Sequence, residues 1–478
     1  MKVYEKKPLS ILQSFETVDS RKVDIQLKEA LRGFKKKIIV LDDDPTGVQT
    51  VHDISVYTDW DEDTIRAGFA ETNNMFFLLT NSRSFSKEET ARIHKDIANR
   101  VCKVSEESGL DFVLISRGDS TLRGHYPLET ETLAAEIKQN RGYDIDGEII
   151  CPFFMEGGRY TFGNIHYAKE GDALIPAGMT EFAWDKTFGY ESSSLPEYIE
   201  EKTKKAYEAN SCITISIEEL RNFQIEDIYE KLMAAKEFNK IIVNAIDYVD
   251  LKIFCIAFLK AIQGGKHFLA RTAAAFPKVL AGIEEIPLLV KADLVKPGKK
   301  IGGIVLIGSH VKKTTLQLQS LMESEKELCF IEFDVNSYFK AGGLEREVNR
   351  TVSEVEPLIK KGNTCIIYTS RKLLVPDTCD KDQILKVSVK ISEAVTSIIG
   401  KLETKPSFIV AKGGITSSDV GTKALKVKKA LVMGQIKKGI PVWMTGAESK
   451  FPGMPYIIFP GNVGEVTTLR EIIEELVD

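Results

Sequence analysis

The sequence predicts an α/β protein of two doubly wound domains, each built on a mostly parallel sheet. Short runs of β-branched and other apolar residues alternate with longer stretches of helical periodicity, which is typical of strand–helix–strand units. This alternation stops at a segment rich in Gly, Pro and Lys, 295–303, and then starts again. We therefore expect a linker near residue 300 that joins a domain of residues 1–296 to a smaller domain of residues 302–478.

The first domain contains apolar runs that end in polar residues, such as IIVLDD, MFFLLTNS and FVLISRGD. Predicted strands span 38–43, 75–82, 112–119, 148–151, 211–215 and 240–245, and predicted helices span 86–107, 126–139 and 248–263. Parallel strands joined by helices place their polar ends at one edge of the sheet, where ligands bind in such folds.

The second domain repeats this pattern on a smaller scale. Predicted strands span 303–309, 328–333, 363–370 and 407–414, with helical segments between them. A last strand, PYIIFPGN, leads into a predicted helix at 464–476. A cleft between two such domains is the expected place for an active site.

The composition excludes several classes of protein. Lys and Arg number 64 against 69 Asp and Glu, a net charge of -5, which disfavours a general nucleic-acid binder. No apolar run reaches the ~20 residues needed to span a membrane, and the segment MKVYEKKPLSILQSF lacks the apolar core of a signal peptide. Seven cysteines without a CxxC pair indicate free thiols in a reducing compartment. We expect a cytoplasmic protein and, from its size, a homodimer.

Three consecutive aspartates, Asp42, Asp43 and Asp44, end the first predicted strand and lead into a Pro-Thr-Gly turn. Like charges repel and burial adds a desolvation cost, so this arrangement needs a cation, a hydroxylated ligand or a basic side chain beside it. The alternative is a solvated loop that caps a helix.

The segment SRGDSTLRGHYPLE places Arg117 and Arg123 on either side of Asp119, Ser120 and Thr121. Its two glycines permit tight turns and close approach. The planar fork of arginine suits a carboxylate or a phosphate, whereas an aspartate and hydroxyl groups suit substrate hydroxyls. The alternative is an internal Arg–Asp ion pair that holds the loop.

The segment TNSRSFS adds Arg83 as another candidate for binding an anion, followed by serines that suit a helix N-cap. Arginines and aspartates at neighbouring strand ends fit a polyhydroxy acid, because arginine takes the carboxylate and aspartate takes the hydroxyls. Further along, CPFFMEGGRYTFGNIHY contains a glycine turn before Arg159 and a histidine, His166. A lone histidine of this kind is more often structural than catalytic.

Three strand–turn–helix units occur in the second domain, at GSHVKKTT (308–315), AKGGITSSDV (411–420) and PGNVGEVTT (460–468). Such turns direct backbone N–H groups and a helix dipole at phosphate. Together they predict a nucleotide site, although the sequence has no GxxxxGK[ST], GxGxxG, GxSxG or HExxH motif.

Taken together, DDPTG, SRGDSTLRG and AKGGITSSD resemble the four-carbon acid sugar kinase family, and the resemblance runs from Asp43 to PGNVG. It implies an N-terminal domain that binds the sugar acid and a C-terminal domain that binds ATP, with Mg²⁺ bridging the phosphates. The implied reaction phosphorylates the terminal hydroxyl of a four-carbon acid such as threonate, erythronate or an oxo-tetronate.

The residues that match the family's motifs are the site residues that the resemblance implies. The sugar acid would be bound by Asp43, Asp44, Thr46, Gly47, Arg83, Arg117, Asp119, Ser120, Thr121, Arg123 and Gly124. The nucleotide would be bound by Ser309, Gly413, Gly414, Ile415, Thr416 and Gly461. Asp119 or Asp44 would act as the base or orienter of the attacking hydroxyl, and Arg83 and Arg123 would fix the carboxylate. The metal ligands stay open.

Two positions depart from the family's pattern. Many members have lysine where Arg117 stands, which changes the hydrogen bonds available to the substrate. Many have an acidic residue where Ile415 stands. The glycine turn of this chain therefore lacks the carboxylate that those members have.

Two other functions are consistent with parts of the sequence. IIVLDDDPT fits the hhhhDxDxT signature of haloacid-dehalogenase-like phosphatases, with Asp42 as nucleophile and Asp44 as acid/base. That interpretation leaves the second domain and the DSTLRG segment without a role. A non-enzymatic sensor of a sugar acid or nucleotide would bind without turnover.

Overall fold

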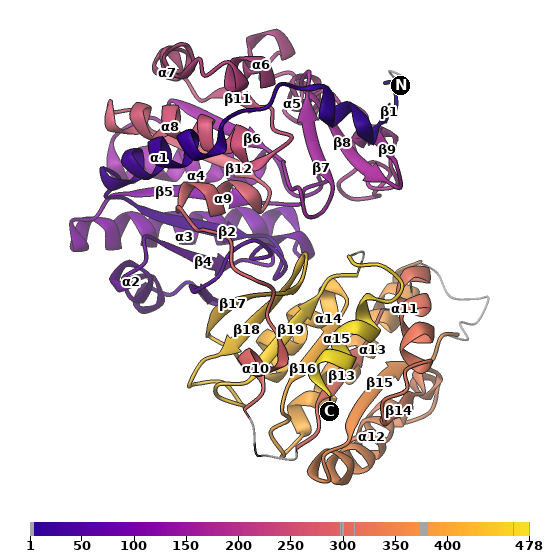
Figure 1. The fold of residues 1–478 in the computed structure, drawn as a ribbon. Helices are drawn as coiled ribbons and strands as arrows, with labels where there is room; N and C mark the ends of the chain where they lie inside the picture. Colours follow the sequence, from indigo (N-terminus) through magenta and orange to yellow (C-terminus); the bar gives the residue numbers. More distant parts are fainter. Residues whose placement is uncertain are drawn as a thin grey trace. The chain divides into compact units, whose positions relative to one another are not determined.

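The computed structural model describes residues 4–296, 298, 301–309, 311–372, 381–461 and 463–477, with the backbone alone for 381–386. The chain forms two compact units (Figure 1): Met1–Gly47 with Asp59–Glu285, and Val48–Thr58 with Ile286–Asp478. Each unit is built on an α/β sheet, so the predicted fold class is confirmed. Residues 297, 299 and 300 of the expected linker lie outside the described residues.

The main sheet of the first unit has the strand order β10-β11-β6-β12-β5-β2-β4, and its neighbouring strands run parallel. The strands are β2 (Lys37–Asp42), β4 (Met75–Leu79), β5 (Phe112–Arg117), β6 (Gly147–Cys151), β10 (Ile213–Ile215), β11 (Asn239–Val243) and β12 (Phe268–Thr272). Each strand predicted in this domain is present. Strand β12 was not predicted, because the run FLART is short and ends in polar residues.

Helices cover the sheet of the first unit: α1 (Ser20–Arg32), α2 (Glu62–Ala70), α3 (Lys87–Ser108), α4 (Leu128–Arg141), α5 (Leu195–Lys202), α6 (Ile217–Arg221), α7 (Ile225–Ala234), α8 (Tyr248–Gln263) and α9 (Ala275–Leu280). Short 3-10 turns are η1 (Leu9–Ser14), η2 (Ser82–Ser84), η3 (Ala177–Met179) and η4 (Ala209–Ser211). Helix α3 begins after Ser86, whose side chain forms a capping box with Glu89, and it ends at Gly109. The predicted N-cap thus fixes the start of the helix that follows Arg83.

A smaller antiparallel sheet in the first unit has the order β1-β9-β8-β7. Its strands are β1 (Lys7–Pro8), β7 (Arg159–Phe162), β8 (Ile165–Glu170) and β9 (Ala173–Pro176). Thr161 exchanges backbone hydrogen bonds with Ala245, just after β11, which attaches this sheet to the main one. The sequence did not predict it, because its strands are short and mix polar with apolar residues.

The second unit has a mixed sheet in the order β3-β17-β18-β19-β16-β13-β15-β14. Strands from β19 to β14 run parallel, whereas β3, β17, β18 and β19 run antiparallel to one another. The strands are β3 (Ile54–Tyr57), β13 (Ile304–Ile307), β14 (Leu328–Phe333), β15 (Thr364–Thr369), β16 (Ile409–Lys412), β17 (Lys429–Lys437), β18 (Ile440–Thr445) and β19 (Pro455–Phe459). The parallel strands match the prediction, and the antiparallel part was not foreseen.

The helical segments of the second unit are α10 (Lys291–Leu294), α11 (Lys312–Met322), η5 (Val335–Phe339), α12 (Gly343–Lys360), α13 (Lys381–Lys401), α14 (Gly414–Asp419), η6 (Val420–Ala424) and α15 (Thr468–Leu476). Its core packs strands β13, β16 and β19 against α15, through residues such as Val305, Val410, Ile457, Leu469 and Ile472. The packing of α15 thereby holds in place the parallel strands that lead into the glycine turns.

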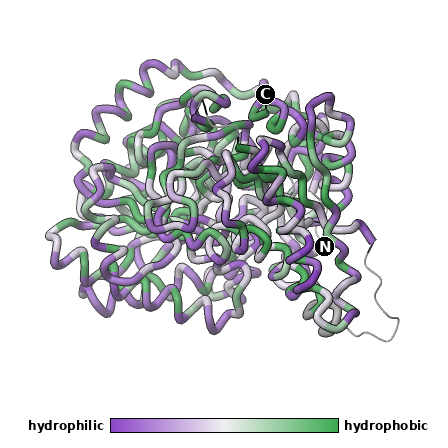
Figure 2. The backbone as a smooth tube through the Cα atoms, turned by 90° about the horizontal axis from the view of Figure 1, so that it is seen from below, coloured by the Kyte–Doolittle hydropathy of each residue, from purple (hydrophilic) through white to green (hydrophobic). Residues whose placement is uncertain are grey.

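Apolar and polar residues separate along the chain as the periodicity predicts. Figure 2 shows helical turns along which green and purple alternate. Among the described helices, none is long and apolar enough to cross a membrane. The described cysteines are free thiols: Cys102, Cys151, Cys212, Cys255, Cys329 and Cys365.

Candidate functional site

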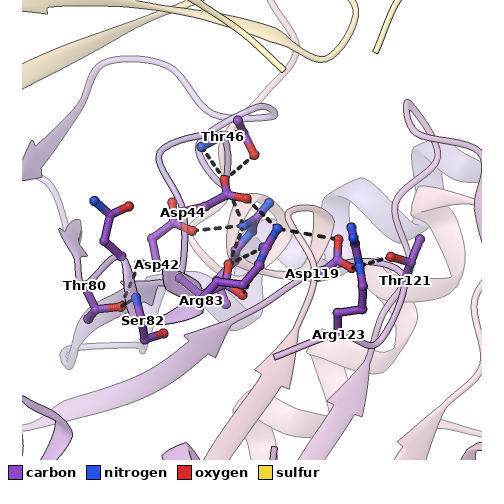
Figure 3. Close-up of polar contacts among 12 residues, drawn as sticks. Asp42, Asp44, Thr46, Thr80, Ser82, Arg83, Asp119, Thr121 and Arg123 are labelled. Atoms are coloured by element: carbon purple, nitrogen blue, oxygen red, sulfur yellow. Dashed lines mark hydrogen bonds and ion pairs between the residues drawn. The ribbon is translucent and has the colours of Figure 1, made fainter. Parts of the chain in front are cut away.

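The candidate sugar-acid site lies where β4, β2 and β5 end side by side. In the register of the sheet, Asp42 is opposite Arg117 on β5 and Leu79 on β4. After β4 the chain turns through Asn81, whose φ of 57° lies in the left-handed region, and the N–H of Arg83 then donates to the carbonyl of Asp43. The predicted motifs of three strands therefore meet at one edge (Figure 3).

Arg83 connects the aspartates of this edge. Its Nη2 lies 2.6 Å from Asp43 Oδ1 and its Nε lies 3.0 Å from Asp43 Oδ2, a two-pronged contact. Its Nη1 lies 2.7 Å from Asp44 Oδ2 and 4.0 Å from Asp119 Oδ1. Burial disfavours the charged guanidinium, but the carboxylates outweigh burial and raise the pKa of Arg83. One cation thus joins the strand-end aspartates to the DSTLRG loop.

Arg117 lies beneath the same aspartates and is 4% exposed. Its Nη1 lies 3.1 Å from Asp42 Oδ1 and 3.1 Å from Asp43 Oδ1. The basic side chains that the three consecutive aspartates need are therefore Arg83 and Arg117. The contacts of Arg117 are those of an internal ion pair, and its predicted contact with a sugar acid stays a prediction.

The three aspartates differ in their ionisation. Burial raises the pKa of Asp42 well above its usual range, although Arg117 opposes the shift. Burial also raises the pKa of Asp43, against the opposing effect of Arg83. For Asp44, burial is outweighed by Arg83 and Arg117, so its pKa is lowered. Asp44, whose side chain is 20% exposed, is thus the aspartate of the three whose pKa is lowered.

The turn after the aspartates is folded onto Asp44. The backbone N–H of Thr46 donates to Asp44 Oδ1 at 2.7 Å, and the Thr46 hydroxyl donates to the same oxygen. A side chain at Gly47 would overlap the carboxylate of Asp42, so only glycine fits there. Thr46 and Gly47 therefore pack against the carboxylates of Asp44 and Asp42.

The DSTLRG loop is held by its own charges. Arg123 Nε donates to Asp119 Oδ2 at 2.7 Å, and the Thr121 hydroxyl donates to the same oxygen (Figure 3). Burial would raise the pKa of Asp119, but Arg83 and Arg123 outweigh it and hold that pKa far below its usual range. Asp119 is therefore ionised near pH 7. Its side chain is 12% exposed.

An arginine that the sequence did not single out fills the space under this loop. Side chains at Gly118 and Gly124 would overlap the guanidinium of Arg271, on β12. Arg271 Nη2 donates to the carbonyl of Arg123 at 3.3 Å, and Nη1 lies 3.2 Å from a carboxylate oxygen of Glu129. The glycines of the motif thus make room for a supporting arginine, which no signal in the sequence revealed because β12 was not predicted.

His166 on β8 supports the loop from the other side. Its Nε2 lies 2.8 Å from the carbonyl oxygen of Ser120, and its Nδ1 lies 2.9 Å from the hydroxyl of Thr161. Burial lowers the pKa of His166 to about 4, so the ring is neutral near pH 7. Both ring nitrogens are engaged, which agrees with the structural role that the sequence favoured.

The predicted nucleotide residues of the second unit come together at the ends of β13, β16 and β19. Gly413 has a φ of 122° and donates its N–H to the carbonyl of Phe459 at 2.9 Å. A Cβ at Gly413 would lie 3.3 Å from Cβ of Ser309, and one at Gly308 would overlap the hydroxyl of Thr416. Ser309, Gly413 and Thr416 therefore line one turn, where backbone N–H groups can meet phosphate.

The other predicted residues of this turn are open. A Cβ added at Gly414 or Gly461 would meet nothing within 4 Å. Ile415 is 68% exposed, so its position points into solvent where an acidic residue would also stand. These positions leave room for a ligand against the backbone.

Two basic residues of this region were not among the predicted site residues. Lys412 is fully buried at the end of β16, and its Nζ donates to the carbonyls of Pro460 at 2.7 Å and Gly461 at 3.2 Å. Burial, together with Lys313, lowers the pKa of Lys412 to about 7. Arg371 Nη1 donates to the carbonyl of Ser309 at 2.8 Å. Both hold backbone segments of the turn.

A resident metal is not supported by the side chains that the structure describes, because they include no group of three or more His, Cys, Asp or Glu residues able to hold an ion. In the candidate site of the first unit the carboxylates face arginines. In the second unit, the carboxylate of Asp419 is paired with a lysine, since its Oδ1 lies 3.0 Å from Nζ of Lys423.

Two family models match this chain. Residues 38–280 match a family described as a sugar-binding N-terminal domain, which covers half of the chain. Residues 304–469 match a family described as a nucleotide-binding C-terminal domain. The comparison with curated proteins gave no match.

Two solved structures share the fold over most of the chain. A Haemophilus influenzae protein of a domain family of unknown function has a TM-score of 0.59 and 16% identity, covering 92% of this chain and 100% of its own. A Salmonella typhimurium LT2 protein, provisionally described as a tRNA synthase, has a TM-score of 0.65 and 15% identity over the same shares. At these identities the likeness shows a shared fold alone.

Proposed function

We propose that this chain, which belongs to the two-domain family of four-carbon acid sugar kinases, transfers the γ-phosphoryl group of ATP to a hydroxyl of a four-carbon sugar acid. The observation that carries the proposal is the array of Asp44, Arg83 and Asp119 in the sugar-binding domain. Ionised carboxylates on either side of a guanidinium suit a ligand that has both hydroxyl and acid groups.

The aspartates are the groups that we assign to the substrate hydroxyls. Asp44 and Asp119 are both ionised and partly exposed, so each can accept a hydrogen bond from a hydroxyl. Phosphoryl transfer passes through a loose transition state and depends more on in-line positioning than on proton removal. A carboxylate whose pKa is strongly lowered is a weak base. Asp119 or Asp44 therefore serves chiefly to orient the attacking hydroxyl.

The glycine turns of the nucleotide-binding domain are the groups that we assign to ATP. Ser309 and Thr416 offer hydroxyls to phosphate oxygens, and the open positions Gly414 and Gly461 offer backbone N–H groups, while Gly413 shapes the turn. Mg²⁺ would arrive bound to the phosphates of ATP, where it neutralises charge and keeps several waters, so a cage of protein carboxylates is not required.

The phosphatase alternative fits the structure less well. Its nucleophile would be Asp42, which is 1% exposed and hydrogen-bonded to Arg117. A nucleophile needs an open path to the phosphorus atom, and Asp42 is covered by the turn at Gly47. That function also leaves the nucleotide-binding domain without a role.

The test of the proposal is an ADP-release assay with Mg-ATP and a panel of four-carbon acids. The panel holds D- and L-threonate, D- and L-erythronate, and the 2-oxo and 3-oxo tetronates. We expect turnover with at least one member, and we expect Asp119→Asn to lower kcat by about 10²- to 10⁴-fold.

Asp146→Asn is the matched control, because Asp146 belongs to the same unit but precedes β6, at the opposite edge of the sheet. It should leave kcat unchanged. Phosphate release from a sugar phosphate without ATP, and no ADP release with any acid, would exclude the kinase and favour the phosphatase.

A further inference from the structure

Arg159 differs from the other arginines of the sugar-binding domain's site. Arg83, Arg117, Arg123 and Arg271 each lie within 3.2 Å of a carboxylate oxygen. Within the described part of the chain, Arg159 has no carboxylate in ion-pair contact. Its Nη1 donates to the carbonyls of Gly157 and Gly158, and its Nε is buried without a hydrogen-bond partner.

Arg159 nevertheless lies close to the aspartate–arginine array. Its guanidinium carbon is 5.4 Å from the centre of the Phe182 ring, and that of Arg123 is 5.0 Å from the same ring. Asp119 and Arg123 are among the charges that act on Arg159. The guanidinium is therefore beside the DSTLRG loop, on the side formed by β7 and the small sheet.

The turn before Arg159 is shaped to hold the guanidinium in place. Gly158 has a φ of 70°, and a side chain at Gly157 would overlap the ring of Phe154. Phe154 and Arg159 exchange backbone hydrogen bonds of 3.1 and 2.8 Å, which fixes the start of β7. The two carbonyls that the turn presents accept from Nη1 alone, and Nε is left without an acceptor.

Burying a cation without a counter-charge costs free energy, and a bound anion would offset that cost. Burial lowers the pKa of Arg159, whereas neighbouring carboxylates raise the pKa of Arg83, Arg117, Arg123 and Arg271. The cations of the other four arginines are already balanced by protein carboxylates. A negative group from outside the chain would balance the fifth.

We propose that Arg159 binds the carboxylate of the sugar acid. This inference rests on the proposed function and assigns the acid group to one residue. Asp44 and Asp119 then face the hydroxyls, while Arg83 and Arg123 keep those aspartates ionised and in position. Arg159 is accordingly the residue that selects an acid over a neutral sugar derivative.

The test compares wild type with Arg159→Gln on the best acid of the panel and on its uncharged amide. We expect the KM for the acid to rise about 100-fold, the KM for ATP to stay constant, and the preference for acid over amide to be lost. Arg159→Lys, which keeps the charge without the fork, should recover part of the loss.

Arg221→Gln is the matched control. Arg221 also lies over an aromatic ring, Phe15, at 5.9 Å, but it is paired with Asp250 at 2.8 Å. Its removal should lower thermal stability and leave the KM for the acid unchanged. Binding of the acid without ATP, followed by calorimetry, gives a second readout that does not require turnover.

The outcomes separate the two proposals. An unchanged KM and an unchanged preference for acid over amide in Arg159→Gln, with an active wild type, would overturn the role of Arg159 alone. A wild type that neither binds nor phosphorylates any acid of the panel would overturn the kinase assignment and the role of Arg159 with it.

Discussion

At the scale of single residues, the molecule concentrates charge where water is largely excluded. Asp42 and Asp43 are 1% and 2% exposed, and their nearest cations are Arg117 and Arg83. A buried ion pair adds little net stability, because desolvation offsets the attraction, but removing one partner leaves an uncompensated charge. These ion pairs therefore fix the positions of the side chains at the strand ends, and they add little to the free energy of unfolding.

The first prediction follows from that asymmetry. Arg117→Gln leaves Asp42 and Asp43 with one cation instead of two, so we expect the free energy of unfolding to fall by about 3–5 kcal/mol. Urea denaturation followed by circular dichroism measures the change. Asp42→Asn with Arg117→Gln removes the stranded charge as well, and the double variant should recover part of the loss. Equal stability of the single variant and wild type would contradict the prediction.

At the scale of elements, Lys412 ties the end of β16 to the segment that follows β19. Its ammonium group donates to the carbonyls of Pro460 and Gly461 and lies 3.8 Å from the centre of the Phe459 ring. Two of the predicted nucleotide turns are thereby joined by one buried side chain.

This contact predicts a dependence of stability on pH. The pKa of Lys412 is about 7 in the folded protein and 10.5 in its ordinary state. Between these values the unfolded chain binds more protons, so the free energy of unfolding rises with pH, by at most ~1.4 kcal/mol per pH unit from this group. Below pH 7 the group contributes no slope.

Urea denaturation at pH 7, 8 and 9 measures that slope. Lys412→Met should reduce it. Lys437→Met is the control, since Lys437 pairs with Glu471 on the surface and its side chain is 35% exposed. An equal slope in wild type and Lys412→Met would show that the lysine is not neutralised by folding.

The parallel strands and their following helices could be predicted from the sequence, because apolar runs and helical periodicity mark them. The small sheet that carries Arg159 and His166 could not, since strands of four to six residues with mixed polarity give no clear period. Motif residues such as Arg83 and Asp119 were found by their place at strand ends. Arg271 was not, because its role depends on which strands become neighbours.

At the scale of the whole molecule, the chain enters the second unit twice. Val48–Thr58 belongs to that unit, where β3 pairs with β17 from Tyr57–Lys429 to Ile54–Val432. The sequence offers no sign of this, because VHDISVYT resembles any short strand of the first domain. We call this excursion of Val48–Thr58 into the second unit the crossing. The expected boundaries of 1–296 and 302–478 remain a prediction, and they do not include the crossing.

The crossing makes a fragment experiment decisive. A fragment of residues 286–478 lacks β3 and leaves β17 as an open edge with unpaired backbone groups. We expect it to self-associate, whereas the same fragment with residues 48–58 joined to its N-terminus by a Gly/Ser linker should stay monomeric. Sedimentation velocity measures the difference. Equal behaviour of the two fragments would show that β3 is dispensable.

The same crossing limits how the two units can be exchanged between relatives. Asp44 and Thr46 belong to the sugar-binding unit, and the next residues after Gly47 already belong to the other unit. A chimera made by a single cut near residue 300 would join a foreign nucleotide unit to a resident β3. A working exchange therefore has to replace two separate stretches of the gene, one of them only eleven codons long.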